Sequence, residues 1–423
     1  MKNSEELRQQ LRSINRKSYP AYKGLKGLYH FGNYILSIDH VQGDPFASPS
    51  HVSIQISHRD AGFPVEYYKD TLTGTTLCDY LTRQFEKQVS QYSFRAKGSG
   101  KSGLLTVSHC GQEILSRTAC EITEKGITAR FFVGFPANGR TINATELEKI
   151  LFDFLPVCIQ KSFFYSSLNA KELQNYIELA EDQEFIRQTL PAKNLCAFIA
   201  DGSILPRESG ISSRPMKASV PFTSPDSLRI SINLPHKGKI TGMGIPKGIT
   251  LIVGGGYHGK STLLNALELG VYNHIPGDGR EYVITDATAV KLRSEDGRFI
   301  KDVDISMFIN DLPNKKDTRC FSTLDASGST SQVSQKAWKP EATFFFLTKT
   351  PPQLTSWFVM LSCSRLSSVR KSRSLRFWSV QKIFIKKQGF LQFLLPEVPG
   401  HSFILQIQLS RWTITFQKIL QLL

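Results

Sequence analysis

The sequence lacks the features that mark membrane-spanning and secreted proteins. Its 423 residues contain no apolar run that approaches the roughly 20 residues of a membrane-spanning helix. The first residues, Met1 to Glu6, are too polar for a signal peptide. The seven cysteines are scattered, and no two form a Cys-x-x-Cys pair, which argues against a zinc site or a disulfide framework. We therefore expect a cytoplasmic protein with reduced thiols and no membrane partner.

Acidic residues are scarce after residue 332, and tryptophan is absent before it. From Val333 to the end there are thirteen Lys and Arg against two acids, whereas residues 1–332 carry 39 basic and 34 acidic side chains. All four tryptophans lie after residue 333. A net charge of +16 would by itself suggest a nucleic-acid partner. Most of that charge belongs to residues 333–423, so the basicity is a property of the tail.

Hydrophobic patterning predicts a chain of mixed helices and strands. Residues 33–38 and 282–286 are typical of strands, and residues 145–152 and 170–190 have helical spacing, the latter ending before Pro191. The Gly/Ser/Pro-rich segment 200–225 predicts an ordered loop that links two domains.

The strongest local signal is a glycine-rich loop between a predicted strand at 249–253 and a predicted helix at 261–269 that stops at Gly270. The loop fits the pattern G-x-x-x-x-G-K-[ST]. In such a loop, backbone N–H groups turn inward around the β-phosphate of a nucleotide, and the helix N-terminus adds partial positive charge. A lysine at this position reaches the β- and γ-phosphates, and the following serine ligates Mg²⁺. The predicted nucleotide-binding residues are Gly254, Gly256, Tyr257, His258, Gly259, Lys260 and Ser261, with Ser261 as the metal ligand.

A second glycine-rich segment, residues 97–102, looks similar but fails the pattern. Arg95 stands where the first glycine would be required, and no apolar strand precedes it. We predict a basic surface turn at this place.

Five strings carry a resemblance to a known family: "SYPAYKGLKGLYHFGNYILSIDHVQGDPFASPS", "AFIADGSILPRESGI", "GMGIPKGITLIVGGGYHGKSTLL", "GVYNHIPGDGREYVITDATAVKLRSEDGR" and "STLDASGSTSQ". They span most of residues 15–332, and they resemble the predicted ATPases of the ABC class, P-loop proteins distinct from membrane transporters. The resemblance implies an α/β P-loop head of ABC-ATPase type after an α+β N-terminal domain, with ATP and Mg²⁺ as cofactors. It also adds Thr262 to the nucleotide loop.

The segment Ser327-Gly328-Ser329, which continues to Gln332, resembles the ABC signature Leu-Ser-Gly-Gly-Gln. In ABC proteins this segment meets the γ-phosphate held by the opposite protomer, so the resemblance implies a homodimer around ATP. By itself the segment would be a polar turn before a helix.

The resemblance leaves the catalytic residues unassigned. No glutamine occurs between residues 263 and 331, so the usual Q-loop residue is missing. Asp286 and Glu295 are acids that could reach magnesium, but nothing in the sequence requires it. Three charged residues of the loop before the head could face nucleotide, but the sequence favours a solvated loop for them: Asp201, Arg207 and Arg214.

The tail departs from the family in its amino acids but keeps the pattern in a shifted reading frame. The apolar run from Thr343 predicts a buried strand, which in the family is followed by Asp and Glu; here Thr348 and Lys349 follow. If each family codon joins the last base of one codon to the first two of the next, residues 347–356 can encode Asp-Glu-Asp-Thr-Thr-Ala-Thr-Asn-Phe. Residues 356–360 can likewise encode Met-Val-Arg-Asp. We predict a frame change near residue 333; the alternative is a divergent C-terminal domain.

These observations predict an N-terminal α+β domain (1–165), an ABC-type ATPase domain (166–332) and an out-of-frame tail without native fold (333–423). The predicted function is ATP binding, with hydrolysis in the intact family member coupled to an unknown partner and lost in this chain together with the catalytic acids. The alternative is a basic RNA-binding protein with nucleotide-dependent switching, for which the tail's charge would have to be native.

Overall fold

A computed structural model describes residues 2–247, 249–252, 259–293, 300–303, 319–323, 344–349, 357–362, 390–397 and 401–408. The chain divides into two compact units. The first comprises Met1–Glu181 with His274–Pro276, and the second comprises Asp182–Asn273 with Gly277–Leu423. Both contain helices and strands, as the patterning predicts.

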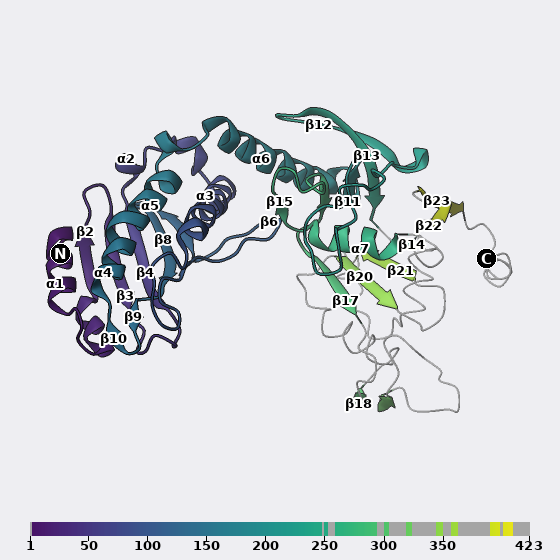
Figure 1. Cartoon of the computed structure of the whole chain (residues 1–423). Coiled ribbons are helices and arrows are strands. Elements are labelled where there is room, and N and C mark those ends of the chain that lie inside the picture. Colours follow the sequence, from purple (N-terminus) through teal and green to yellow (C-terminus); the bar gives the residue numbers. More distant parts are fainter. Residues whose placement is uncertain are drawn as a thin grey trace. The chain divides into compact units, whose positions relative to one another are not determined.

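The first unit is built on a mixed sheet whose strands all lie in residues 2–133, a range that the structure describes throughout (Figure 1). Seven strands follow the order β1-β2-β3-β4-β8-β5, with β7 also paired to β8. Every pair is antiparallel except β1 and β2. The bounds are β1 (Lys2–Asn3), β2 (Gly27–His30), β3 (Ile35–His40), β4 (Ser50–Ile56), β5 (Leu105–Thr106), β7 (Cys120–Thr123) and β8 (Gly126–Val133). The predicted strand at 33–38 is confirmed as β3, but β3 begins and ends two residues later.

Helices pack against this sheet through aromatic side chains. On α3 (Thr71–Tyr92), the ring of Phe85 lies 5.1 Å from that of Phe131 on β8 and 5.1 Å from that of Phe163 on α5 (Leu155–Phe163). Such edge-on and tilted contacts stabilise a core beyond the area they bury. These helices cover one face of β4: Val52, Ile54 and Ile56 are buried, whereas His51 and Gln55 are exposed.

Shorter elements complete the first unit. They are α1 (Ser4–Ser13), η1 (Tyr19–Leu25), α2 (His58–Ala61), η2 (Val65–Tyr67), β6 (Glu113–Ile114), β9 (Ala137–Asn138), β10 (Thr141–Ile142), α4 (Ala144–Glu148), η3 (Lys149–Phe154) and η4 (Tyr165–Ser167). The predicted helix at 145–152 is confirmed as α4 and η3, although η3 is a π-helical turn. The glycine-rich segment 97–102 is a turn, as predicted. Its glycines have a packing role, since a Cβ on Gly100 would lie 2.5 Å from the carbonyl oxygen of Pro45.

The chain passes from the first unit to the second within α6 (Ala170–Ala192). The helix was expected to end before Pro191, and this boundary is wrong by two residues. Pro191 lies in the last turn of the helix. There it removes a single N–H donor, and its own carbonyl accepts a hydrogen bond from the Asn194 N–H at 3.0 Å.

The second unit has an antiparallel sheet with a helix on each face. Within residues 195–285, leaving out 248 and 253–258, the order is β12 (Arg229–Leu234), β13 (Gly238–Pro246), β11 (Leu195–Ala200) and β16 (Val283–Thr285). One face packs against Leu263, Leu264 and Leu267 of α7 (Lys260–Leu269). The other packs against Ile186 and Leu190 of α6. Every residue of β11 is buried because both faces of this strand are covered.

A further sheet of the second unit contains the strand before the predicted phosphate loop. Among the described residues its order is β17 (Ala289–Arg293), β20 (Phe344–Lys349), β21 (Trp357–Ser362), β14 (Ile249–Ile252), β22 (Phe390–Glu397) and β23 (His401–Gln408). β17 and β20 are parallel, as are β14 and β22, and the other pairs are antiparallel. The strands predicted at 249–253 and after Thr343 are therefore confirmed. The remaining elements are η5 (Asp226–Leu228), β15 (Asn273–His274), β18 (Ile300–Val303) and β19 (Phe321–Thr323).

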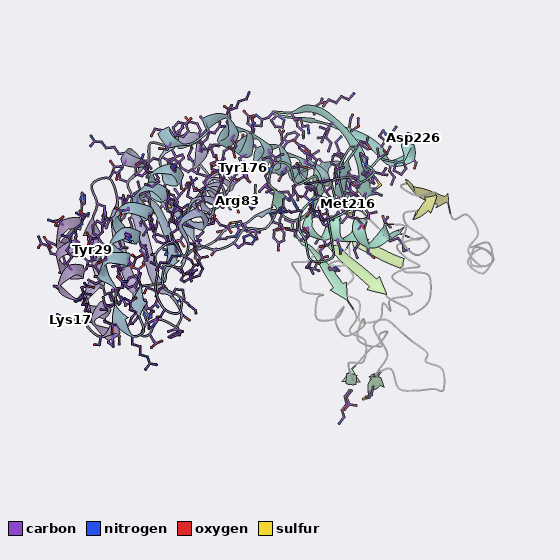
Figure 2. The ribbon with its side chains drawn as sticks, viewed as in Figure 1. Lys17, Tyr29, Arg83, Tyr176, Met216 and Asp226 are labelled. Atoms are coloured by element: carbon purple, nitrogen blue, oxygen red, sulfur yellow. The ribbon has the colours of Figure 1, made fainter. Side chains whose placement is uncertain are left out.

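The Gly/Ser/Pro-rich segment 200–225 lies inside the second unit and does not link two units, which corrects the sequence-based expectation. It is an irregular but ordered loop (Figure 2, where Met216 is labelled). Its hydrogen bonds explain its order. The Gly202 N–H donates to the Phe222 carbonyl at 2.8 Å, and the Ile204 N–H donates to the Gly279 carbonyl at 2.7 Å.

Candidate nucleotide-binding site

The predicted phosphate loop lies between β14, which ends at Ile252, and α7, which begins at Lys260. Four of its predicted residues, Gly254, Gly256, Tyr257 and His258, lie outside the described residues. Gly259 precedes the helix with φ 76° and ψ 4°. A Cβ here would meet nothing within 4 Å, so the left-handed conformation, and not lack of space, is what favours glycine.

The first turn of α7 contains the three remaining residues of the predicted loop. Lys260 is the first helical residue and is 8% exposed, and burial lowers the pKa of its ammonium group. Ser261 is exposed, and Thr262 is partly buried. The structure thus brings Gly259, Lys260, Ser261 and Thr262 to one helix N-terminus, where the helix dipole favours an anion.

The position of α7 is fixed at its C-terminal end by β16. The hydroxyl of Thr285 donates to the Leu267 carbonyl at 2.8 Å, and the Thr285 N–H donates to the Gly270 carbonyl at 2.9 Å. Gly270 caps the helix, as predicted, but in a right-handed conformation (φ −63°). Glycine is required at this position because β16 approaches it closely: a Cβ would lie 2.8 Å from both the Thr285 hydroxyl and the Val283 carbonyl oxygen.

Arg187 of α6 also contacts the C-terminal end of α7. Its guanidinium donates to the Gly270 carbonyl at 3.4 Å, to Asn273 Oδ1 at 2.8 Å and to Glu184 Oε2 at 2.7 Å. A cation at a helix C-terminus complements the partial negative charge there. No local pattern predicts this contact, because Asn273 and Gly270 lie 86 and 83 residues from Arg187 in the sequence.

The charged loop residues prove to be mostly structural. Asp201 accepts hydrogen bonds from the Ser224 N–H at 2.5 Å and the Thr241 hydroxyl at 2.9 Å. Burial tends to raise the pKa of Asp201, but these hydrogen bonds and the nearby Arg229 hold it below its ordinary value. Arg207 forms an ion pair at 2.9 Å with Asp278, whose side chain is fully buried. The prediction that the side chains of Asp201 and Arg207 are solvated is therefore wrong.

Arg214 differs from these two, because its side chain is exposed. Its backbone N–H is held by the Ser212 hydroxyl at 3.2 Å, and its carbonyl accepts from the Glu208 N–H at 3.0 Å. The loop is thus ordered around it while the guanidinium faces solvent.

Of the two acids that could reach magnesium, the structure describes Asp286 but not Glu295. Asp286 Oδ1 accepts hydrogen bonds from the Thr288 N–H at 2.9 Å and the Thr288 hydroxyl at 2.6 Å. The Asp286 N–H donates to the Cys196 carbonyl at 3.0 Å, so Asp286 holds the turn between β16 and β17. Glu295 and the predicted signature residues Ser327, Gly328 and Ser329 lie outside the described residues. Thr348 and Lys349 end β20.

Within the described part of the chain, no three His, Cys, Asp or Glu side chains form a group that could hold a metal ion. Nor does any helix described there have the length and apolar character to cross a membrane. Six cysteines in the described ranges are free thiols, and of these only Cys320 is exposed.

Comparison with known proteins places the chain. The family model for the N-terminal domain of ATPases of the ABC class matches residues 4–166, and the model for the family's P-loop domain matches residues 169–344. The uncharacterized protein MJ1628 of Methanocaldococcus jannaschii is 35% identical over 140 residues, which are 31% of this chain and 31% of that protein. The likeness to this relative therefore spans less than a third of its length. The two family matches together cover most of the chain, which belongs to the ATPases of the ABC class.

Proposed function

We propose that this chain binds ATP with Mg²⁺ at residues 254–262. The observation that carries the proposal is the first turn of α7, where a left-handed Gly259 is followed by the buried Lys260. The ammonium of a lysine and the partial positive charge of a helix N-terminus have the same sign, so both attract an anion. A bound polyphosphate would neutralise both charges.

Each residue of the loop has a role in this proposal. The backbone N–H groups of Gly254, Gly256 and Gly259 would surround the β-phosphate, with Tyr257 and His258 between them. The ammonium of Lys260 would contact the β- and γ-phosphates, and the hydroxyls of Ser261 and Thr262 would lie at the helix N-terminus, Ser261 as the ligand of Mg²⁺. The bound Mg²⁺ would supply charge neutralisation on the phosphates. We also propose that the protein is cytoplasmic and that Ser327, Gly328 and Ser329 contact the nucleotide of a second copy in a homodimer.

The same proposal includes a defect in hydrolysis. Thr348 and Lys349 end β20, where the family resemblance expects an aspartate and a glutamate. Lysine cannot accept a proton from an attacking water at neutral pH, and it repels Mg²⁺. The match to the P-loop domain ends at residue 344, close to the frame change proposed near residue 333. The intact family member would hydrolyse ATP for a partner that remains to be found.

The test is equilibrium binding of ATP in the presence of Mg²⁺ to the full chain and to Lys260→Ala. Loss of a charge-assisted contact predicts an affinity about 10- to 100-fold lower. Lys239→Ala is the matched control, since Lys239 is an exposed lysine on β13. Equal affinities for all three proteins would refute the site. So would an equal loss in both variants, since that would reflect net charge alone.

The net charge of +16 favours RNA binding as a second candidate function. This candidate requires the basic tail to be native. Single-stranded RNA should then bind the chain as given with strong salt dependence, and a version with the shifted frame restored should bind more weakly. Equal RNA binding by both versions would remove the tail as its source.

A further inference from the structure

Two histidines of the first unit stand directly opposite each other on neighbouring strands. His40 ends β3, and His51 is the second residue of β4; the two are partners in the register of the antiparallel pair. Their ring centroids are 5.4 Å apart, with an angle of 60° between the ring planes. Both side chains are exposed. The pair belongs to neither the nucleotide loop nor the core.

The backbone holds this pair in place. Val52 follows His51, and Ile38 lies two residues before His40; both are buried in the core of the unit and are partners in the register, which shifts by one residue between Ile38 and His40. The ring of His51 also makes an edge-on contact with Phe132 of β8, at 5.1 Å and 84°. A ligand that bridged both imidazoles would therefore find the strands already ordered and would have only side-chain rotations to fix.

The carboxylate of Asp39 adds negative charge beside the pair. Its two oxygens accept hydrogen bonds from the Ser37 hydroxyl at 2.5 Å and the Ser53 hydroxyl at 2.7 Å. Ser53 lies two residues from His51 on the same strand, so the carboxylate is held on the face of the sheet that carries His51. A cation near the histidines would be attracted by this charge.

The separation of the rings suits a shared metal ion. A tetrahedral ion with two imidazole nitrogens at about 2.1 Å needs those nitrogens about 3.4 Å apart, and each nitrogen lies on the order of 1 Å from its ring centroid. Rings with centroids 5.4 Å apart can present nitrogens at that distance. Imidazole is a ligand for Zn²⁺, Cu²⁺ and Ni²⁺, whereas Mg²⁺ and Ca²⁺ prefer oxygen.

We propose that His40 and His51 form a binding site for a divalent transition-metal ion, with Zn²⁺ or Cu²⁺ as the ligand. The described residues hold no group of three metal-ligating side chains, so the two imidazoles are the protein ligands and water fills the other positions. Such a site binds more weakly than a closed structural zinc site and exchanges its ion with solution. By the Irving–Williams order, Cu²⁺ binds more tightly than Zn²⁺.

The experiment is equilibrium dialysis of the untagged full chain against Zn²⁺ or Cu²⁺ without nucleotide, with the bound metal measured by elemental analysis. The variants are His40→Ala, His51→Ala and the double variant. Because the second ligand acts as an intramolecular contact, losing either imidazole should weaken binding by about 10²-fold, and the double variant should be little worse than the singles. Mg²⁺ should not bind to this site.

His109→Ala is the matched control, because His109 is an exposed histidine whose Nδ1 lies 2.5 Å from Glu86 Oε1 and is a rival place for a metal ion. The proposal expects unchanged binding in this variant. Binding retained in both His40→Ala and His51→Ala, or abolished by His109→Ala, would overturn it, as would a wild-type chain that binds neither metal. Circular dichroism spectra measured without metal should be the same for all variants, although the unfolding midpoint of His51→Ala should fall because this variant loses the contact with Phe132, and this separates loss of the site from loss of the fold.

Discussion

Replacing Gly270 with alanine tests how the candidate site is positioned. The added methyl would lie 2.8 Å from the Thr285 hydroxyl and 2.8 Å from the Val283 carbonyl oxygen. Neither neighbour can easily yield. Thr285 donates from its hydroxyl to Leu267 and from its N–H to Gly270, and Val283 is paired with Ile199 of β11. The methyl must therefore displace the end of α7 from β16.

Overpacking of this kind costs about 1–3 kcal/mol of unfolding free energy. Part is offset, because alanine restricts the unfolded chain and gains about 0.4–1 kcal/mol. The control is Gly210→Ala, where a Cβ meets nothing within 4 Å and φ is not positive, so the variant makes the same gain without the clash. The difference between the two variants in urea unfolding isolates the contact. Thermal midpoints should differ by about 2–4 °C per kcal/mol. If Gly270→Ala is as stable as Gly210→Ala, the proposed packing of α7 on β16 is refuted.

Two further predictions concern the loop 200–225. Arg207→Met removes the ion pair of the fully buried Asp278 and should lower the free energy of unfolding by about 3–5 kcal/mol. Arg214→Met, at an exposed position, should change it by less than about 0.5 kcal/mol. Equal effects of the two variants in urea unfolding would contradict the ion pair. Because the folded-state pKa of Asp201 is lowered, its contribution to stability is present above about pH 4 and is lost as pH falls through that folded pKa. Asp201→Asn should therefore reduce the loss of stability on acidification below pH 4, and an unfolding profile parallel to that of wild type would disprove this role.

Local patterns predicted the elements of the site better than its contacts. The strand and helix on either side of the phosphate loop could be predicted because β-branched residues precede the glycines and helix-forming residues follow Lys260. Gly270 was correctly predicted as the end of α7. The reason it must be glycine could not be predicted, since it depends on Thr285, fifteen residues later on a strand of the sheet.

Contacts between distant parts of the sequence account for the other differences. Asp201 and Arg207 look like solvated loop residues, because nothing local shows that Ser224, Thr241 and Asp278 will meet them. A local rule predicts that the helix stops before Pro191. The helix continues because Ile186 and Leu190 pack against the sheet and hold the last turns of α6 there. The pair His40 and His51 has no sequence signal at all, since it depends on the register of two strands.

The most direct test of the account compares the chain as given with a version in which the shifted frame after residue 332 is restored, measuring ATP binding and ATP turnover in both. The account predicts that both bind ATP through Lys260. It predicts turnover only in the restored version, with the chain as given slower by about 10³-fold or more, since groups that act on this transition state are worth that much. Equal turnover in the two proteins would contradict the account, because it would show that residues 333–423 form a working part of the enzyme.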